Sequence, residues 1–172
     1  MTKRARYWHE LDDGRIECEL CPRRCRLRPG QRGACFVRRN DSGALVLAYY
    51  GRTSGFCVDP IEKKPLYHFF PGSTILSFGT VGCHLACRHC QNWHLSAADN
   101  DALLRESAAP DEIARACVQT GCSSVAFTYN DPIPSLEFVV DVAAACRKLG
   151  MKTVAVTNGY ITPEACGEFF GA

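Results

Sequence analysis

The second half of the chain alternates short apolar runs with segments whose apolar residues recur at helical spacing. Three apolar runs predict β-strands, at 74–80, 123–129 and 152–157. Each strand is followed by a predicted helix, at 111–119, 135–149 and 163–170. Three consecutive β-α units predict a parallel sheet covered by helices with right-handed crossovers, which is an α/β fold.

The first half has a different pattern. Residues 44–50 read Ala-Leu-Val-Leu-Ala-Tyr-Tyr and predict one strand beside a cysteine-rich segment. Residues 51–73 are rich in glycine, proline and aromatic residues, and we interpret them as a linker. The predicted organisation is therefore a cysteine-rich N-terminal region with its linker at 1–73 and a core domain at 74–172.

Composition narrows the class of protein. Of the 172 residues, 47% are hydrophobic and 22% are charged, which is ordinary for a chain with one substantial core. No apolar stretch follows the basic start and no run reaches membrane-spanning length, so we expect a cytoplasmic protein without a membrane partner. Twelve cysteines in such a protein are expected to be metal ligands and reduced thiols.

A cysteine triplet directly follows the first predicted strand. Cys83, Cys87 and Cys90 form a C-x3-C-x2-C run, and three thiolates can each hold one iron of a 4Fe-4S cluster. No fourth cysteine lies close by, so one iron would keep an open coordination position. The alternative is a buried helix face, which Gly79, Gly82 and the polar residues between the cysteines disfavour.

Polar residues also follow the other two predicted strands. Asn130 and Asp131 follow the second strand, and Thr157 and Asn158 follow the third. Each pair alone also suits an ordinary turn. Because the carboxyl ends of parallel strands meet at one edge, we expect both pairs and the cysteine triplet to form one site.

These residues resemble the radical S-adenosylmethionine (SAM) superfamily, in which a C-x3-C-x2-C loop follows the first barrel strand. Further segments are similar to one branch, the AmmeMemoRadiSam-system radical SAM proteins, which are related to pyruvate formate-lyase activating enzymes. The segments are 59–68, 90–93, 127–132 and 157–161. The resemblance runs from about Ala5 to the last residue.

The resemblance implies a partial (β/α)6 TIM-like barrel, of which this chain would be the N-terminal half with a small cysteine-rich extension. It implies that Cys83, Cys87 and Cys90 hold the cluster. It also implies SAM contacts by Asn130, Asp131, Thr157 and Asn158. The chain departs from the family pattern at Asp131, where glutamate is usual, and at His89, where phenylalanine or tyrosine is usual. No catalytic residue beyond these is indicated.

The implied activity is that of a radical SAM oxidoreductase. Relatives reductively cleave SAM to a 5'-deoxyadenosyl radical, which abstracts a hydrogen atom from the substrate. The activase branch suggests a protein substrate and an electron donor such as flavodoxin or ferredoxin. With three β-α units in place of six, this chain is expected to be an inactive fragment of such an enzyme.

A second cysteine group lies in the basic N-terminal region, where residues 1–40 carry eleven Lys or Arg against five Asp or Glu. Its members are Cys18, Cys21, Cys25 and Cys35. Four thiolates between glycine and proline turns suit either zinc or a second Fe-S cluster, although they can also be unrelated cysteines.

The competing function is an RNA-binding or RNA-modifying module with a zinc-ribbon-like site. No base-stacking aromatic residue lies between Cys18 and Cys35, so nucleic acid is not expected.

Overall fold

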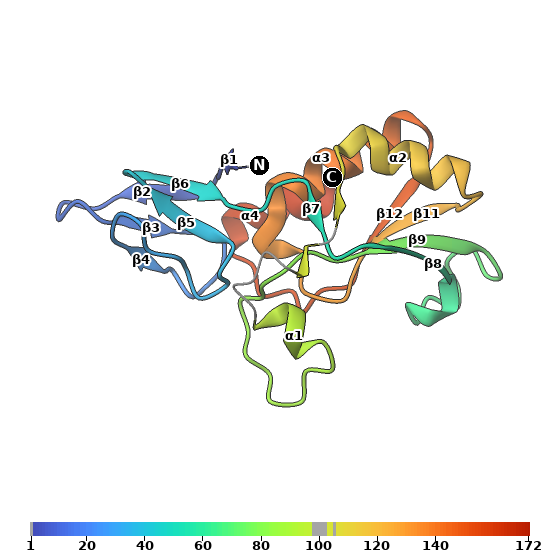
Figure 1. Cartoon of the computed structure of the whole chain (residues 1–172), viewed down its shortest axis with the longest axis horizontal. Helices are drawn as coiled ribbons and strands as arrows, with labels where there is room; N and C mark the ends of the chain where they lie inside the picture. The colour runs from blue at the N-terminus through green and yellow to red at the C-terminus, as the bar shows by residue number, and fades with distance from the viewer. Residues whose placement is uncertain (1, 98–102, 105) are drawn as a thin grey trace.

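The fold was obtained as a computed structural model, which describes residues 2–97, 103–104 and 106–172. Figure 1 shows short N-terminal strands at one end of the molecule and a larger sheet at the other, with the main helices on one face of that sheet. The loop that contains the cysteine triplet lies where these two parts meet. The architecture is mixed α/β, and the described strands form no closed barrel.

The main sheet has the strand order β12-β11-β9-β8. The three predicted parallel strands are confirmed as β9 (Thr74–Phe78), β11 (Ser124–Phe127) and β12 (Lys152–Ala155). The sequence did not predict β8 (Phe56–Pro60), which pairs antiparallel with β9. Part of the segment 51–73, interpreted as a linker, is therefore an edge strand of the sheet, and the interpretation is wrong for those residues. Proline and glycine on either side of β8 obscured its short apolar pattern.

The predicted helices are confirmed as α2 (Pro110–Gln119), α3 (Leu136–Lys148) and α4 (Pro163–Gly171). At the start of α2 the Glu112 side chain accepts a hydrogen bond of 2.7 Å from the Ala109 amide. After α3, Gly150 has φ +72°, a conformation that ends helices and that glycine adopts without strain. None of the helices in the described part of the chain has the length and apolar character needed to span a membrane.

Short elements complete the connections. The helix α1 (Trp93–Ser96) follows the cysteine triplet, and the 3-10 turns η1 (Ile61–Lys63) and η3 (Ile133–Ser135) follow β8 and β11. The strands β7 (Arg52–Thr53) and β10 (Glu106–Ser107) pair with each other.

The N-terminal region consists of two small antiparallel sheets with the orders β2-β3-β4 and β1-β6-β5. Their strands are β1 (Lys3–Arg4), β2 (Trp8–Glu10), β3 (Ile16–Cys18), β4 (Arg26–Leu27), β5 (Arg38–Asp41) and β6 (Ala44–Leu47). The strand predicted at 44–50 is thus confirmed as β6, with a turn in place of its last residues.

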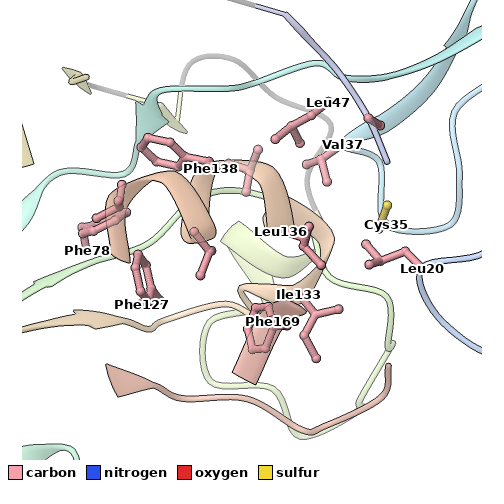
Figure 2. Packing of buried hydrophobic residues seen from close by; sticks show 14 of the residues in the cluster. Leu20, Cys35, Val37, Leu47, Phe78, Phe127, Ile133, Leu136, Phe138 and Phe169 are labelled. Atoms are coloured by element: carbon pink, nitrogen blue, oxygen red, sulfur yellow. The ribbon is translucent and has the colours of Figure 1, made fainter. Parts of the chain in front are cut away.

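One continuous hydrophobic core joins the N-terminal region to the main sheet. Figure 2 shows Leu20, Val37 and Leu47 beside Leu136, while Phe138 packs between the helix layer and the sheet. All of these side chains are almost completely buried and belong to a single cluster. The N-terminal region is therefore packed onto the core domain and is not tethered only through a linker.

A buried ion pair crosses the same boundary. Arg38 on β5 is 1% exposed and donates to the carboxylate of Glu137 on α3, which is 0% exposed. Arg38 also donates to the carbonyl oxygens of Arg6 and Pro134, each at 3.1 Å. Glu137 accepts a further bond of 2.7 Å from the Arg6 amide. The buried guanidinium of Arg38 thus donates to three acceptors, and these bonds offset the free-energy cost of removing its charge from water.

The ion pair gives a prediction about stability. The Arg38→Met substitution leaves the Glu137 carboxylate buried without its cation, so we expect a loss of about 3–5 kcal/mol in the free energy of unfolding. Urea denaturation followed by circular dichroism measures this. The matched control is Arg39→Met. Arg39 is half-buried and lies 3.5 Å from its partner Asp41, which is exposed to solvent. This substitution should lower the free energy of unfolding by about 1 kcal/mol or less. Equal losses in the two variants would contradict the prediction.

Candidate functional site

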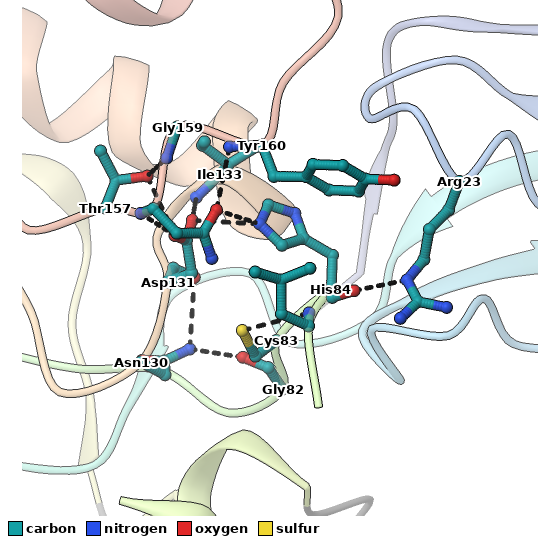
Figure 3. A network of polar contacts seen from close by, with 12 residues as sticks. Arg23, Gly82, Cys83, His84, Asn130, Asp131, Ile133, Thr157, Gly159 and Tyr160 are labelled. Atoms are coloured by element: carbon teal, nitrogen blue, oxygen red, sulfur yellow. Dashed lines mark hydrogen bonds and ion pairs between the residues drawn. The ribbon is translucent and has the colours of Figure 1, made fainter. Parts of the chain in front are cut away.

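The register of the parallel strands brings the three polar segments together. Phe78 pairs with Phe127, and Phe127 pairs with Ala155, so β9, β11 and β12 end at the same level. The chain leaves all three strands at this edge, and Figure 3 shows the residues that follow them in one network of polar contacts. The predicted convergence of the three segments is thus seen in their positions.

Asn130 fixes the backbone that leads into the cysteine loop. Its Oδ1 accepts a hydrogen bond of 2.8 Å from the Thr80 amide. Its Nδ2 donates to Thr80 Oγ1 at 2.9 Å and to the Gly82 carbonyl oxygen at 2.8 Å. Both ends of this buried amide are therefore used within the protein, and the side chain positions the loop that begins at Cys83. A contact between Asn130 and SAM stays a prediction.

Asp131 connects the ends of β11 and β12. Its Oδ2 accepts bonds from Thr157 Oγ1 at 2.9 Å and from the Asn158 amide at 2.8 Å. Its Oδ1 accepts the Ile133 amide at 2.9 Å. With three donors on a carboxylate that is only 6% exposed, Asp131 holds the two loops in place. A direct contact with SAM stays a prediction for Asp131, Thr157 and Asn158.

His84 extends this network to the cysteine loop, and sequence reasoning did not single it out. Its Nε2 lies 3.0 Å from Asn158 Oδ1 and 3.7 Å from Asp131 Oδ1. Its backbone carbonyl accepts a hydrogen bond from Arg23 Nε of the N-terminal region. The ring is 2% exposed, and its Nδ1 has no hydrogen-bond partner among the described residues. Its position between two strand-end loops is not visible in a linear pattern.

The three cysteines line one cavity beside this network. Its volume is about 370 Å³, and Arg23, Phe36, His84 and Trp93 form part of the wall. Cys83 and Cys90 are half-buried and Cys87 is exposed. Burial raises the pKa of the Cys83 thiol, while a hydrogen bond of 3.5 Å from the Leu85 amide to its sulfur works in the opposite direction.

The arrangement of the three thiolates fits a 4Fe-4S cluster, in which each thiolate binds a different iron at a separate corner. Within the described ranges, the N-terminal cysteine quartet included, no group of three Cys, His, Asp or Glu side chains is placed to hold one metal ion. Three soft sulfur donors on the wall of a cavity of ligand size, about 300–1,000 Å³ in typical binding sites, match the requirement of the cluster.

Comparison with known proteins agrees with this chemistry. The sequence model of the radical SAM superfamily matches residues 78–172, which is over half of the chain and includes the three cysteines and both strand-end loops. The chain belongs to the radical SAM superfamily. Proteins of this superfamily use a 4Fe-4S cluster and SAM as cofactors. The relation to the AmmeMemoRadiSam branch is not decided by this match.

One curated relative of this radical SAM chain is an uncharacterized protein of Methanocaldococcus jannaschii, which is 38% identical over 162 residues. The match covers 94% of this chain and 49% of the relative. The chain thus spans about half the length of the curated protein it matches. No solved structure matches the chain.

A second polar cluster joins residues of segments 59–68 and 127–132, and the motif analysis did not predict that these residues meet. Asp59 on β8 is 4% exposed and accepts hydrogen bonds from Lys63 Nζ at 2.7 Å, Lys64 Nζ at 2.8 Å and the Tyr129 hydroxyl at 3.2 Å. Tyr129 has φ +70°, which is strained for a bulky residue. Asp59 pairs with Ile75, whose cluster with Ile61 and Ala126 is separate from the main core. Alternation along β9 therefore places this polar cluster on the face of the sheet opposite α2 and α3.

The Asp59 cluster predicts a pH dependence of stability. Burial opposes ionisation of this carboxyl, but the hydrogen bonds from Lys63 and Lys64 outweigh burial and hold its pKa well below the usual range. A carboxyl whose pKa is depressed on folding stabilises the protein above its unfolded-state pKa of about 3.9 and loses that contribution as the pH falls toward the folded value. The gap in urea midpoint between wild type and Asp59→Asn should therefore be widest near neutral pH and narrow below about pH 4.

The matched control for Asp59 is Asp12→Asn, because Asp12 is exposed in a turn. Its effect on the urea midpoint should be small at every pH. A gap for Asp59→Asn that stays constant from neutral to acid pH would show that the ion pairs do not stabilise the fold.

Gly82 gives a test of how the cysteine loop is packed. Its φ is +78°, and a Cβ added there would lie 2.0 Å from the Cys35 carbonyl oxygen and 2.9 Å from Val37 Cγ1. Gly14 has the same φ of +78° with nothing within 4 Å of such a Cβ. Gly14→Ala should cost only the backbone strain of about 1–2 kcal/mol. Gly82→Ala should cost a further ~1–3 kcal/mol from overpacking and lower the iron content after reconstitution.

Urea denaturation of the two glycine variants measures the difference in stability, and iron analysis measures the loss of cluster. If Gly82→Ala behaves like Gly14→Ala in both assays, the Cys35 segment does not press against the cysteine loop as described.

Proposed function

We propose that this chain is the cluster-binding half of an enzyme that cleaves SAM reductively and abstracts a hydrogen atom from a protein substrate. In this proposal Cys83, Cys87 and Cys90 hold the 4Fe-4S cluster, and one iron stays open for SAM. The observation that carries the proposal is the position of all three cysteines on the wall of one cavity, beside the joined ends of β9, β11 and β12.

The bound cofactors supply the radical chemistry, in which one electron splits the sulfonium of SAM into methionine and a 5'-deoxyadenosyl radical. The protein's own residues supply geometry. Asn130 holds the backbone before Cys83, and Asp131 holds the loop of Thr157 and Asn158 against the same edge. These fixed loops leave little freedom in the wall that faces the cofactors, which favours one orientation of SAM.

The substrate class and electron donor are inferred from the branch resemblance. The similarity to activating enzymes of glycyl-radical proteins favours a protein substrate, and such enzymes receive electrons from flavodoxin or ferredoxin. Two residues that line the cavity, Cys87 and Trp93, are exposed to solvent, and the exposed fraction of Trp93 is 68%. An exposed indole beside the cluster loop offers an aromatic contact to a protein surface.

Four arginines of the N-terminal region favour the enzyme over the RNA-binding alternative. Arg23 donates to the His84 carbonyl, Arg26 pairs with Glu17 at 2.8 Å, and Arg24 lies 3.2 Å from Glu19. Arg32 donates to the Tyr49 hydroxyl at 2.9 Å. Guanidinium groups that already have partners within the chain offer fewer contacts to phosphates.

The cluster assignment is tested by anaerobic reconstitution. Wild type should bind about four irons and four sulfides at the triplet, and its reduced electron paramagnetic resonance spectrum should change when SAM is added. The variant Cys83→Ala/Cys87→Ala/Cys90→Ala should lose the cluster and the SAM-dependent change. Formation of 5'-deoxyadenosine under dithionite is the second readout, compared between this chain and a chain extended by three further β-α units.

The control is Cys57→Ala, because Cys57 is exposed on β8 and does not line the cavity. It should keep the cluster and the SAM response. A SAM-responsive cluster that persists in the triple variant would overturn the assignment, whereas equal 5'-deoxyadenosine formation by the short and extended chains would show that this half suffices.

A further inference from the structure

The four N-terminal cysteines meet in one small space. Cys18 ends β3, Cys21 and Cys25 lie in the loop before β4, and Cys35 lies in the turn before β5. All four line a cavity of about 20 Å³, although they are separated by up to seventeen positions in the sequence. A Cβ at Gly33 would lie 3.7 Å from Cys25 Sγ and 3.8 Å from Cys35 Sγ. Both sulfurs therefore lie on the same side of the backbone at Gly33.

Backbone amides lie close to these sulfurs. The amide of Leu20 lies near Cys18, that of Arg23 lies near Cys21, and that of Val37 lies near Cys35. In each case the amide is two residues after the cysteine, and the Arg38 amide also lies near Cys35. Repeated amide donors stabilise the negatively charged form of a sulfur, which is the form that binds metal.

The size of the cavity decides between one ion and a cluster. A space of about 20 Å³ is close to the room that a single water molecule needs, about 10–15 Å³. The cavity of Cys83, Cys87 and Cys90 is about 370 Å³. As they stand, no three side chains of the quartet are placed to hold one ion, and we expect the sulfurs to turn inward about their side-chain torsions when the ion binds. A closed four-thiolate site of this size is typical of structural zinc.

The segments that carry the quartet also contact the cluster loop. The Cys35 carbonyl lies so close to Gly82 that only a glycine fits there, and Arg23 donates to the carbonyl of His84. The Thr162 hydroxyl, just before α4, donates to the Glu19 carbonyl at 2.7 Å, and the Thr162 amide donates to Leu20 at 3.1 Å. Movement of the Cys18–Cys35 segments would therefore be transmitted to the backbone on which Cys83 is placed.

We propose that Cys18, Cys21, Cys25 and Cys35 bind one zinc ion, and that this ion holds the N-terminal loops against the backbone of residues 82–84. The zinc site itself is independent of the proposed SAM chemistry. Only the second part, the support of the cluster loop, rests on the proposed function of Cys83, Cys87 and Cys90. Zinc is thus a structural ion placed directly beside a radical SAM cluster loop.

Metal analysis tests the site without relying on the cluster. The variant Cys83→Ala/Cys87→Ala/Cys90→Ala, purified with zinc, should retain about one zinc per chain. Cobalt in place of zinc should give the intense absorption of tetrahedral thiolate ligation. Cys21→Ser/Cys25→Ser in that background should lose both signals, while Cys166→Ser, which lies on α4 outside the quartet's cavity, should keep them.

Three outcomes overturn the zinc site. If the triple variant binds about four irons with four sulfides after reconstitution, the quartet holds a second cluster. If it binds neither metal, or keeps zinc after loss of Cys21 and Cys25, the quartet is not the ligand set. A wild-type chain without a SAM-responsive cluster would contradict the proposed function and leave this zinc measurement unchanged.

Hydrogen exchange tests the support of the cluster loop. The Gly82 amide donates to the Leu95 carbonyl at 2.8 Å, so its exchange reports on the order of the loop. In the cluster-free triple variant, zinc should slow exchange in peptides that span 79–90 at least several-fold. A peptide covering α2 (110–119) serves as the control and should be unaffected. Equal exchange with and without zinc in 79–90 would show that the ion does not support the loop.

Discussion

The parallel register of β9, β11 and β12 is the constraint on which the site depends. Because Phe78, Phe127 and Ala155 lie side by side, the three loops after the strands begin at one edge. A slip of one residue in any strand would turn its side chains to the other face of the sheet. Burial of Phe78 and Phe127 against α3 makes such a slip costly, so hydrophobic packing on one face determines where the chemistry is placed.

The polar contacts at that edge act mainly as positioning groups. Asn130 and Asp131 use their side-chain atoms within the protein, the first toward the cysteine loop and the second toward Thr157 and Asn158. A site assembled from buried, hydrogen-bonded loops is preorganised, and preorganised loops are what the proposed function requires of a protein that binds and orients its cofactors.

The N-terminal region is part of the same physical unit. Its hydrophobic core is continuous with that of the main sheet. The Arg38–Glu137 ion pair joins the N-terminal region to α3, and both side chains are almost completely buried. The N-terminal region also contacts the cysteine loop, because the Cys35 carbonyl packs against Gly82 and Arg23 donates to the His84 carbonyl. The cysteine quartet therefore lies where a bound ion would stabilise both the small sheets and the edge at which the radical SAM motif is placed.

The sequence by itself determined the three β-α units and the cysteine triplet, because helical and strand periodicities are local and a C-x3-C-x2-C spacing is read directly from the chain. The sequence also showed that Asn130 and Asp131 follow the second strand and that Thr157 and Asn158 follow the third. Only the tertiary structure decided that β8 completes the sheet, that His84 bridges two strand-end loops, and that Asp59, Lys64 and Tyr129 form a cluster. These features join segments far apart in the chain, and such contacts arise from packing, which leaves no local pattern in the sequence.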